Sequence, residues 1–221
     1  MRALAQPKVL VQASVAAIVT ALAAYPRLAM WSERDKPVLL LEIFLIWAAF
    51  VLWSFAFGWH EQYTGRKIIN FSASPKLWGW ATAAGLSGAG VLLLMVDPQM
   101  RLTTPKDFPA THAAWIAMSL FTLAFEPLFF CFAPFAFFMR LIRKPQVAIV
   151  LTVLFEVFVL YLKLSLSKTL PSALFVTALV LLRITAGFVS LYLYAQGGAL
   201  LVWWMVVLVE LRHLFHLSGT T

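Results

Sequence analysis

Seven long apolar runs, separated by short polar segments, dominate the pattern of this chain. Each run is about 17 to 27 residues long, close to the length that an α-helix needs to cross a bilayer. The pattern predicts an all-α fold, a polytopic transmembrane helix bundle of about seven spans that forms a single membrane domain over residues 1–221. The predicted spans are Val9–Trp31, Val38–Trp59, Leu77–Val96, Ala113–Met139, Val147–Leu164, Pro171–Ala195 and Ala199–Phe215.

The segments between the runs are short, which predicts a compact bundle with neighbouring spans side by side. His60–Lys76 is predicted to be a loop, and so is Asp97–His112, which contains three prolines. His60 and His112 flank these loops, and we expect both side chains to be solvated or interfacial.

The composition narrows the class of protein further. Apolar residues make up 62% of the 221 residues and charged residues only 12%, whereas soluble domains have about 45–50% and about 25%. The mean hydropathy is +0.89. These values exclude a soluble two-domain enzyme, a disulfide-rich secreted module and a disordered chain. The single cysteine, Cys131, permits no internal disulfide and is predicted to be a small buried apolar residue.

The net charge of +8 does not indicate a nucleic-acid partner, because the basic residues are scattered in short loops, as expected beside anionic headgroups. We expect an integral protein of the bacterial inner (cytoplasmic) membrane. The predicted loops divide the basic residues evenly between the two sides. The compact cluster of Arg140, Arg143 and Lys144 favours a cytoplasmic N-terminus.

Ionisable residues inside a span are costly, and they are usually functional or paired. The runs contain Glu42, Glu126, Glu156, Arg183 and Glu210. Glu126 directly precedes Pro127, and a proline removes a backbone hydrogen bond and kinks a helix. Two interpretations follow: a polar pocket beside the kink, or a structural kink in which Glu126 is protonated or paired with Arg183.

Glu210 and His213 are three residues apart, so they share a helix face. Glu-x-x-His is a metal-ligand spacing in helix bundles, where it occurs twice with two further carboxylates. Here it occurs once, although Glu126 and Glu156 could complete a site from neighbouring helices. The alternative is a pair of interfacial side chains. We therefore expect no resident metal or other cofactor.

Phenylalanines crowd the predicted fourth span, from Phe125 to Phe138. Such an aromatic surface could hold a lipid, a pigment or an acyl chain. It could equally face lipid or pack against other helices.

Three stretches of the C-terminal half carry a family resemblance. The sequence around Phe125-Glu126-Pro-Leu-Phe-Phe130 resembles the first motif of the CPBP family of intramembrane proteases, the CAAX-processing and bacteriocin-protection group. Phe155–Val159 resembles the second motif, and Gly187–Gly198 resembles the glycine-rich penultimate span and its turn. The resemblance implies a four-span CPBP-like core over 113–221, preceded by three N-terminal spans over 1–112.

The departures from the family pattern concern its chemistry. The family has a carboxylate pair, helix-borne histidines and supporting Arg and Asn residues. Of these polar positions, this chain keeps one, as Glu126. Apolar residues stand at the other positions: Phe125, Phe130, Val159, Val207 and Leu211. The resemblance therefore implies that the catalytic function has been lost. It favours a non-catalytic membrane subunit: a scaffold, accessory or lipid- or pigment-holding component that binds other membrane proteins.

Two alternatives stay open. Glu126, Glu156, Glu210 and His213 could form a relocated site in an active, metal- or glutamate-dependent intramembrane endopeptidase. A small transporter could use Glu126, Glu156 and Arg183 to line a path, but that architecture is built from two related halves, and the sequence contains no internal repeat.

Overall fold

A computed structural model of the protein describes residues 3–31, 38–103, 108–165 and 172–217. These residues contain helices and no strand. The helices are α1 (Pro7–Trp31), α2 (Val38–Phe55), α3 (Glu61–Thr64), α4 (Pro75–Val91), α5 (Asp97–Thr103), α6 (His112–Pro127), α7 (Ala133–Ile142), α8 (Pro145–Ser165), α9 (Ala173–Gly197), α10 (Ala199–Glu210) and α11 (Leu214–Leu217).

Among the described residues, seven continuous helical rods are long and apolar enough to cross a membrane. Three of them, α1, α8 and α9, are single helices. The other four join consecutive helices end to end: α2 with α3, α4 with α5, α6 with α7, and α10 with α11. The predicted all-α polytopic bundle of about seven spans is confirmed.

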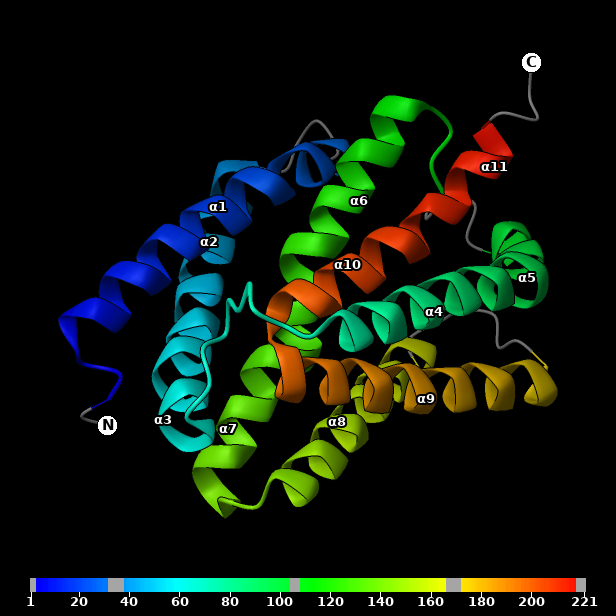
Figure 1. Ribbon diagram of the computed structural model, residues 1–221. Coiled ribbons are helices and arrows are strands. Elements are labelled where there is room, and N and C mark those ends of the chain that lie inside the picture. The colour runs from blue at the N-terminus through cyan, green and yellow to red at the C-terminus, as the bar shows by residue number, and fades with distance from the viewer. Residues whose placement is uncertain (1–2, 32–37, 104–107, 166–171, 218–221) are drawn as a thin grey trace.

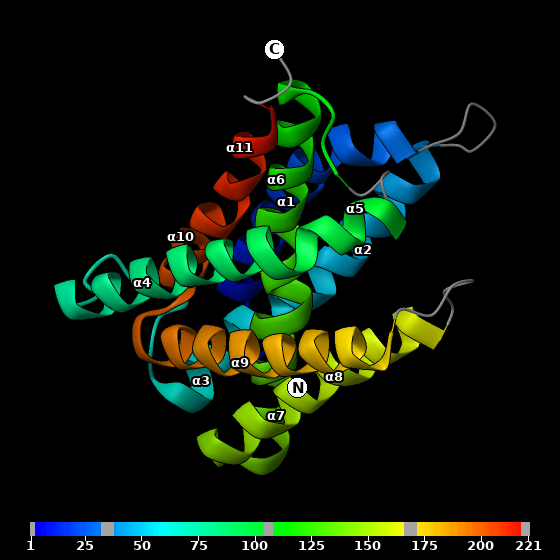
Figure 2. The same ribbon diagram turned by 90° about the vertical axis from the view of Figure 1, so that its right-hand side faces the viewer.

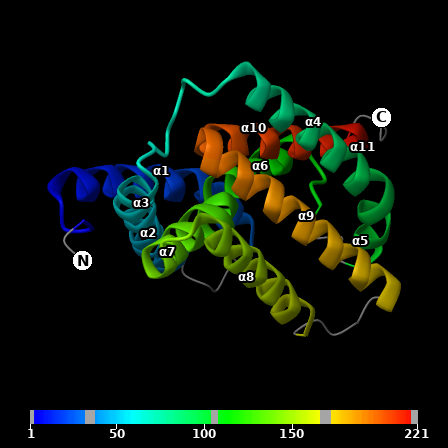
Figure 3. The same ribbon diagram turned by 60° about the horizontal axis from the view of Figure 1, so that its bottom comes forward.

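The rods cross one another at large angles (Figure 1). α1 packs along α2 and also against α6, while α4 packs along α10. α8 and α9 lie side by side, which Figures 2 and 3 show from two further directions. The rod formed by α6 and α7 passes through the middle of the bundle and contacts neighbours along its length.

Three of the described spans contain a short π-helical segment, in which each backbone bond reaches one residue further than in an α-helix. These segments are η1 (Ala56–His60), η2 (Leu92–Val96) and η4 (Leu128–Phe132). η4 follows Pro127 directly. Since proline has no N–H to donate, the distortion predicted at Pro127 takes the form of a local π-helical turn.

Two loop predictions are wrong in part. The helix expected to end at Trp59 continues through η1 and α3 to Thr64, where Gly65 adopts φ +67°. The segment predicted as a loop from Asp97 begins with helix α5. Pro98 lies in the first turn of α5, directly after η2, where α-helical hydrogen bonding is already interrupted and the missing N–H costs little.

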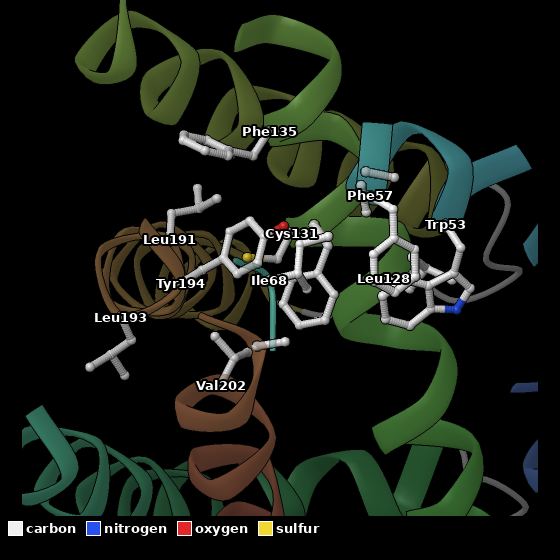
Figure 4. Packing of buried hydrophobic residues seen from close by; sticks show 14 of the residues in the cluster. Trp53, Phe57, Ile68, Leu128, Cys131, Phe135, Leu191, Leu193, Tyr194 and Val202 are labelled. Carbon is white, nitrogen blue, oxygen red and sulfur yellow. The ribbon is translucent and has the colours of Figure 1, made fainter. Parts of the chain in front are cut away.

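The core lies where α2, η4, α7, α9 and α10 meet. Figure 4 shows Trp53 and Phe57 on one side of this cluster and Phe135 and Tyr194 on the other, with Cys131 between them. Cys131 is buried, as predicted.

A backbone hydrogen bond joins the chain between α3 and α4 to the turn between α9 and α10. The backbone N–H of Ala199 donates to the carbonyl of Ile68 at 2.8 Å. Gly198 adopts φ +85°, and a Cβ built there would lie 2.3 Å from that carbonyl oxygen. Only glycine fits this contact without displacing the backbone.

Candidate functional site

An ion pair joins α8 to α9 inside the bundle. The Nε atom of Arg183 lies 3.1 Å from Oε2 of Glu156, whose side chain is buried. Gly187 follows Arg183 by one helical turn, and a Cβ built there would lie 3.1 Å from the same carboxylate oxygen. The missing side chain of Gly187 therefore leaves the space that Glu156 occupies against α9.

The guanidinium group of Arg183 also contacts an aromatic ring of η4. Its Cζ lies 4.2 Å from the ring centroid of Phe130, within the range of a cation–π interaction. The Arg183 side chain is 30% exposed, so it reaches from the outer surface to the buried carboxylate. The carboxylate and the ring together stabilise the guanidinium charge, which would otherwise be costly inside a membrane span.

Glu126 lies in the last turn of α6, next to Pro127 and η4. Its electrostatic neighbours are Arg183, Lys163 and Arg212. Within the described part of the chain, its carboxylate forms neither a hydrogen bond nor an ion pair. The possible pairing of Glu126 with Arg183 is therefore incorrect: Arg183 pairs with Glu156, because the gap at Gly187 places that carboxylate beside the guanidinium group.

A second polar network lies where α5, α6 and the end of α10 meet. The Nε atom of Arg212 donates to the Asp97 carboxylate at 3.1 Å, and its Nη1 atom lies 3.5 Å from Oε1 of Glu210. Ser119 donates to Oε2 of Glu210 at 3.4 Å, and the indole N–H of Trp115 donates to the Glu210 backbone carbonyl at 3.0 Å. Asp97 and Glu210 are both buried, so this network joins three helices through groups that water cannot reach.

The structure brings Glu210 and His213 together, as their spacing predicts. Nε2 of His213 lies 4.0 Å from Oε2 of Glu210, and the imidazole packs edge-on against Phe108 with centroids 5.6 Å apart. Glu156 belongs to the other cluster, with Arg183. Over residues 3–31, 38–103, 108–165 and 172–217, no group of three or more His, Cys, Asp or Glu side chains is placed to hold a metal ion.

The expectation that His60 is solvated or interfacial is wrong. His60 is fully buried, and its ring lies 4.5 Å from that of Tyr194 and 5.9 Å from that of Phe135. Neither ring nitrogen of His60 nor the Tyr194 hydroxyl has a hydrogen-bond partner among the described residues. The sequence did not predict that His60 is buried, because His60 directly follows the apolar run. The helix continues beyond that run through η1.

Comparison with known proteins identifies no relative of the chain: no family model, curated protein or solved structure matches it.

Proposed function

We propose that this protein is a non-catalytic integral membrane subunit, a scaffold or accessory component of a larger assembly in the bacterial inner membrane. The observation that carries the proposal is the pairing of two intramembrane carboxylates, Glu156 and Glu210, with arginines. Glu156 is held by Arg183, and Glu210 by Arg212 and Ser119. A carboxylate engaged in this way joins helices and is not free to activate water.

The positions that resemble the CPBP protease motifs support the same function. Phe125 stacks on Phe129 with centroids 5.7 Å apart, and Phe129 lies 5.8 Å from Phe155. Phe130, which stands where the family has Arg, packs against Arg183. Peptide hydrolysis needs a general base together with a metal or a second acid, and phenylalanine side chains supply neither. We interpret the fold as a CPBP-like bundle whose active site has become packing surface.

The outer surface of the rods is apolar, which indicates a lipid bilayer environment. On α2, Leu39, Leu40, Phe44 and Trp47 are each more than half exposed. Aromatic and branched side chains of this kind bind lipid tails or the helices of other subunits equally well. The proposed partners are therefore membrane proteins, with lipid or pigment in any gaps between them.

The charges also support an orientation. The last turn of α7 and the turn that follows it carry a compact cluster of Arg140, Arg143 and Lys144. Because cytoplasmic loops carry the excess of Lys and Arg, we place the N-terminus in the cytoplasm.

One observation favours a second function, an intramembrane endopeptidase. Glu126 is a carboxylate without a hydrogen bond or ion pair among the described residues, beside a proline and a π-helical turn, and π-helical turns are frequent at functional sites. In that case Glu126 would act as the general base.

A Glu126→Gln variant separates the two functions. Purified wild-type protein and variant are incubated with membrane peptides, and cleavage and bound metal are measured by mass spectrometry. Glu42→Gln is the matched control, because it removes an intramembrane carboxylate on α2, outside both clusters. The proposal predicts the same cleavage background in all three proteins and no stoichiometric zinc. Stoichiometric zinc, with cleavage that only Glu126→Gln abolishes, would overturn it.

A further inference from the structure

A groove opens at the end of the bundle where α7 terminates. It has a volume of about 430 Å³ and is lined by Trp59, Phe137, Arg140, Leu141 and Arg143. One part of its wall is therefore basic and the other part is aromatic and aliphatic. No carboxylate is among the lining residues.

The basic part is held in place by local structure. α7 ends at Ile142, and Arg143 adopts a left-handed conformation, with φ 58°, that turns the chain away from the helix axis. The guanidinium carbons of Arg140 and Arg143 each lie 5.9 Å from the ring centroid of Tyr63. A single tyrosine ring therefore lies close to both cations.

The apolar part continues onto the lipid-facing surface. Trp59 stacks on Phe55 with centroids 4.4 Å apart and lies 6.2 Å from Phe137. Leu141 is 62% exposed and Phe137 is 39% exposed. An apolar chain that lies along these two side chains would extend into the bilayer without a break.

We propose that this groove binds one anionic phospholipid. The phosphate lies beside the guanidinium groups of Arg140 and Arg143, and an acyl chain follows Phe137 and Leu141. Arginine pairs bind phosphate through charge-assisted hydrogen bonds, and basic pockets between membrane helices bind anionic headgroups. A free phosphate ion would leave the apolar half unused. The inference does not depend on whether the chain is a subunit or a peptidase.

The test uses the purified full-length chain in detergent, titrated with phosphatidylglycerol or phosphatidylcholine and followed by native mass spectrometry. The variant is Arg140→Gln/Arg143→Gln. The matched control is Lys67→Gln/Lys76→Gln, which removes the same charge from exposed residues outside the groove. We expect one retained phosphatidylglycerol in the wild type and control, and binding weakened by about tenfold or more in the arginine variant.

A second variant keeps the test valid if the double variant folds poorly. Leu141→Ala shortens the apolar wall of the groove at an exposed side chain, and should weaken phosphatidylglycerol binding by about threefold or more. Three outcomes would overturn the proposal: unchanged binding in both variants, equal retention of phosphatidylcholine, or displacement of the lipid by excess inorganic phosphate. The last would identify a simple anion site.

Discussion

Arg183 reaches across from α9 to place its Nε atom 3.1 Å from Oε2 of Glu156 on α8, while its guanidinium group packs against the ring of Phe130. This contact joins three segments that are far apart in the sequence. It also neutralises a charge that would be costly inside a bilayer. The ion pair engages Glu156 in helix packing and leaves Glu126 as the carboxylate that an enzymatic function would use.

Removing the guanidinium group should destabilise the bundle. Arg183→Gln leaves Glu156 buried without its partner, and breaking a fully buried pair costs about 3–5 kcal/mol. Because the Arg183 side chain is 30% exposed, we expect a smaller loss, about 2 kcal/mol, measured by tryptophan fluorescence during unfolding in detergent. Lys163→Gln on α8, which removes an exposed charge, is the control. The two side chains are not coupled if the double variant Glu156→Gln/Arg183→Gln loses as much unfolding free energy as the single variants Glu156→Gln and Arg183→Gln lose together.

Close packing of α4 on α10 predicts that Gly85 cannot be replaced. A Cβ built there would lie 2.9 Å from the carbonyl oxygen of Met205 and 2.9 Å from Cβ of Leu208. Gly85→Ala should therefore cost about 1–3 kcal/mol of stability through overpacking. Gly79 lies on the same helix with open space around it, so Gly79→Ala should be neutral or stabilise by up to about 1 kcal/mol. Equal unfolding midpoints for the two variants would show that the α4–α10 contact is not this close.

The two glycines with positive φ should differ in tolerance. Gly198→Ala places a methyl group 2.3 Å from the Ile68 carbonyl oxygen, whereas nothing lies within 4 Å of a Cβ at Gly65. We expect Gly65→Ala to lose only the conformational term, about 1–2 kcal/mol. Gly198→Ala should lose more, because the link from Ala199 to Ile68 must also shift. Detergent-resistant yield and thermal midpoint measure the difference, and an equal loss for both variants would argue against the contact.

The distribution of basic residues predicts the topology. We expect the cluster of Arg140, Arg143 and Lys144 after the fourth span to be cytoplasmic. With seven spans among the described residues, this predicts a cytoplasmic N-terminus and a C-terminus on the opposite side. Alkaline phosphatase fused after residue 221 should be active, because this enzyme folds only outside the cytoplasm, and a fluorescent protein fused there should be dark. An inactive phosphatase fusion together with a fluorescent protein fusion that is bright would show the opposite orientation.

The spans were predictable because length and hydropathy decide membrane insertion, whichever neighbours a helix has. The contacts between side chains inside the bundle were not predictable from the sequence. Sequence could not assign Glu126 or Glu156 to Arg183, since the choice depends on how α8 rotates against Gly187. Asp97 and Arg212 are separated by 115 residues and meet because α4 packs along α10. His60 was misplaced because a π-helical segment prolongs a helix beyond its most apolar stretch.

The composition of the complex extracted from native membranes in mild detergent tests most directly whether the chain is a subunit of a larger assembly. Quantitative mass spectrometry of the purified, tagged chain should find at least one other membrane protein in a fixed molar ratio to it, retained in the Glu126→Gln variant. Extraction of the 24.7 kDa chain alone, or only with copies of itself, would contradict it.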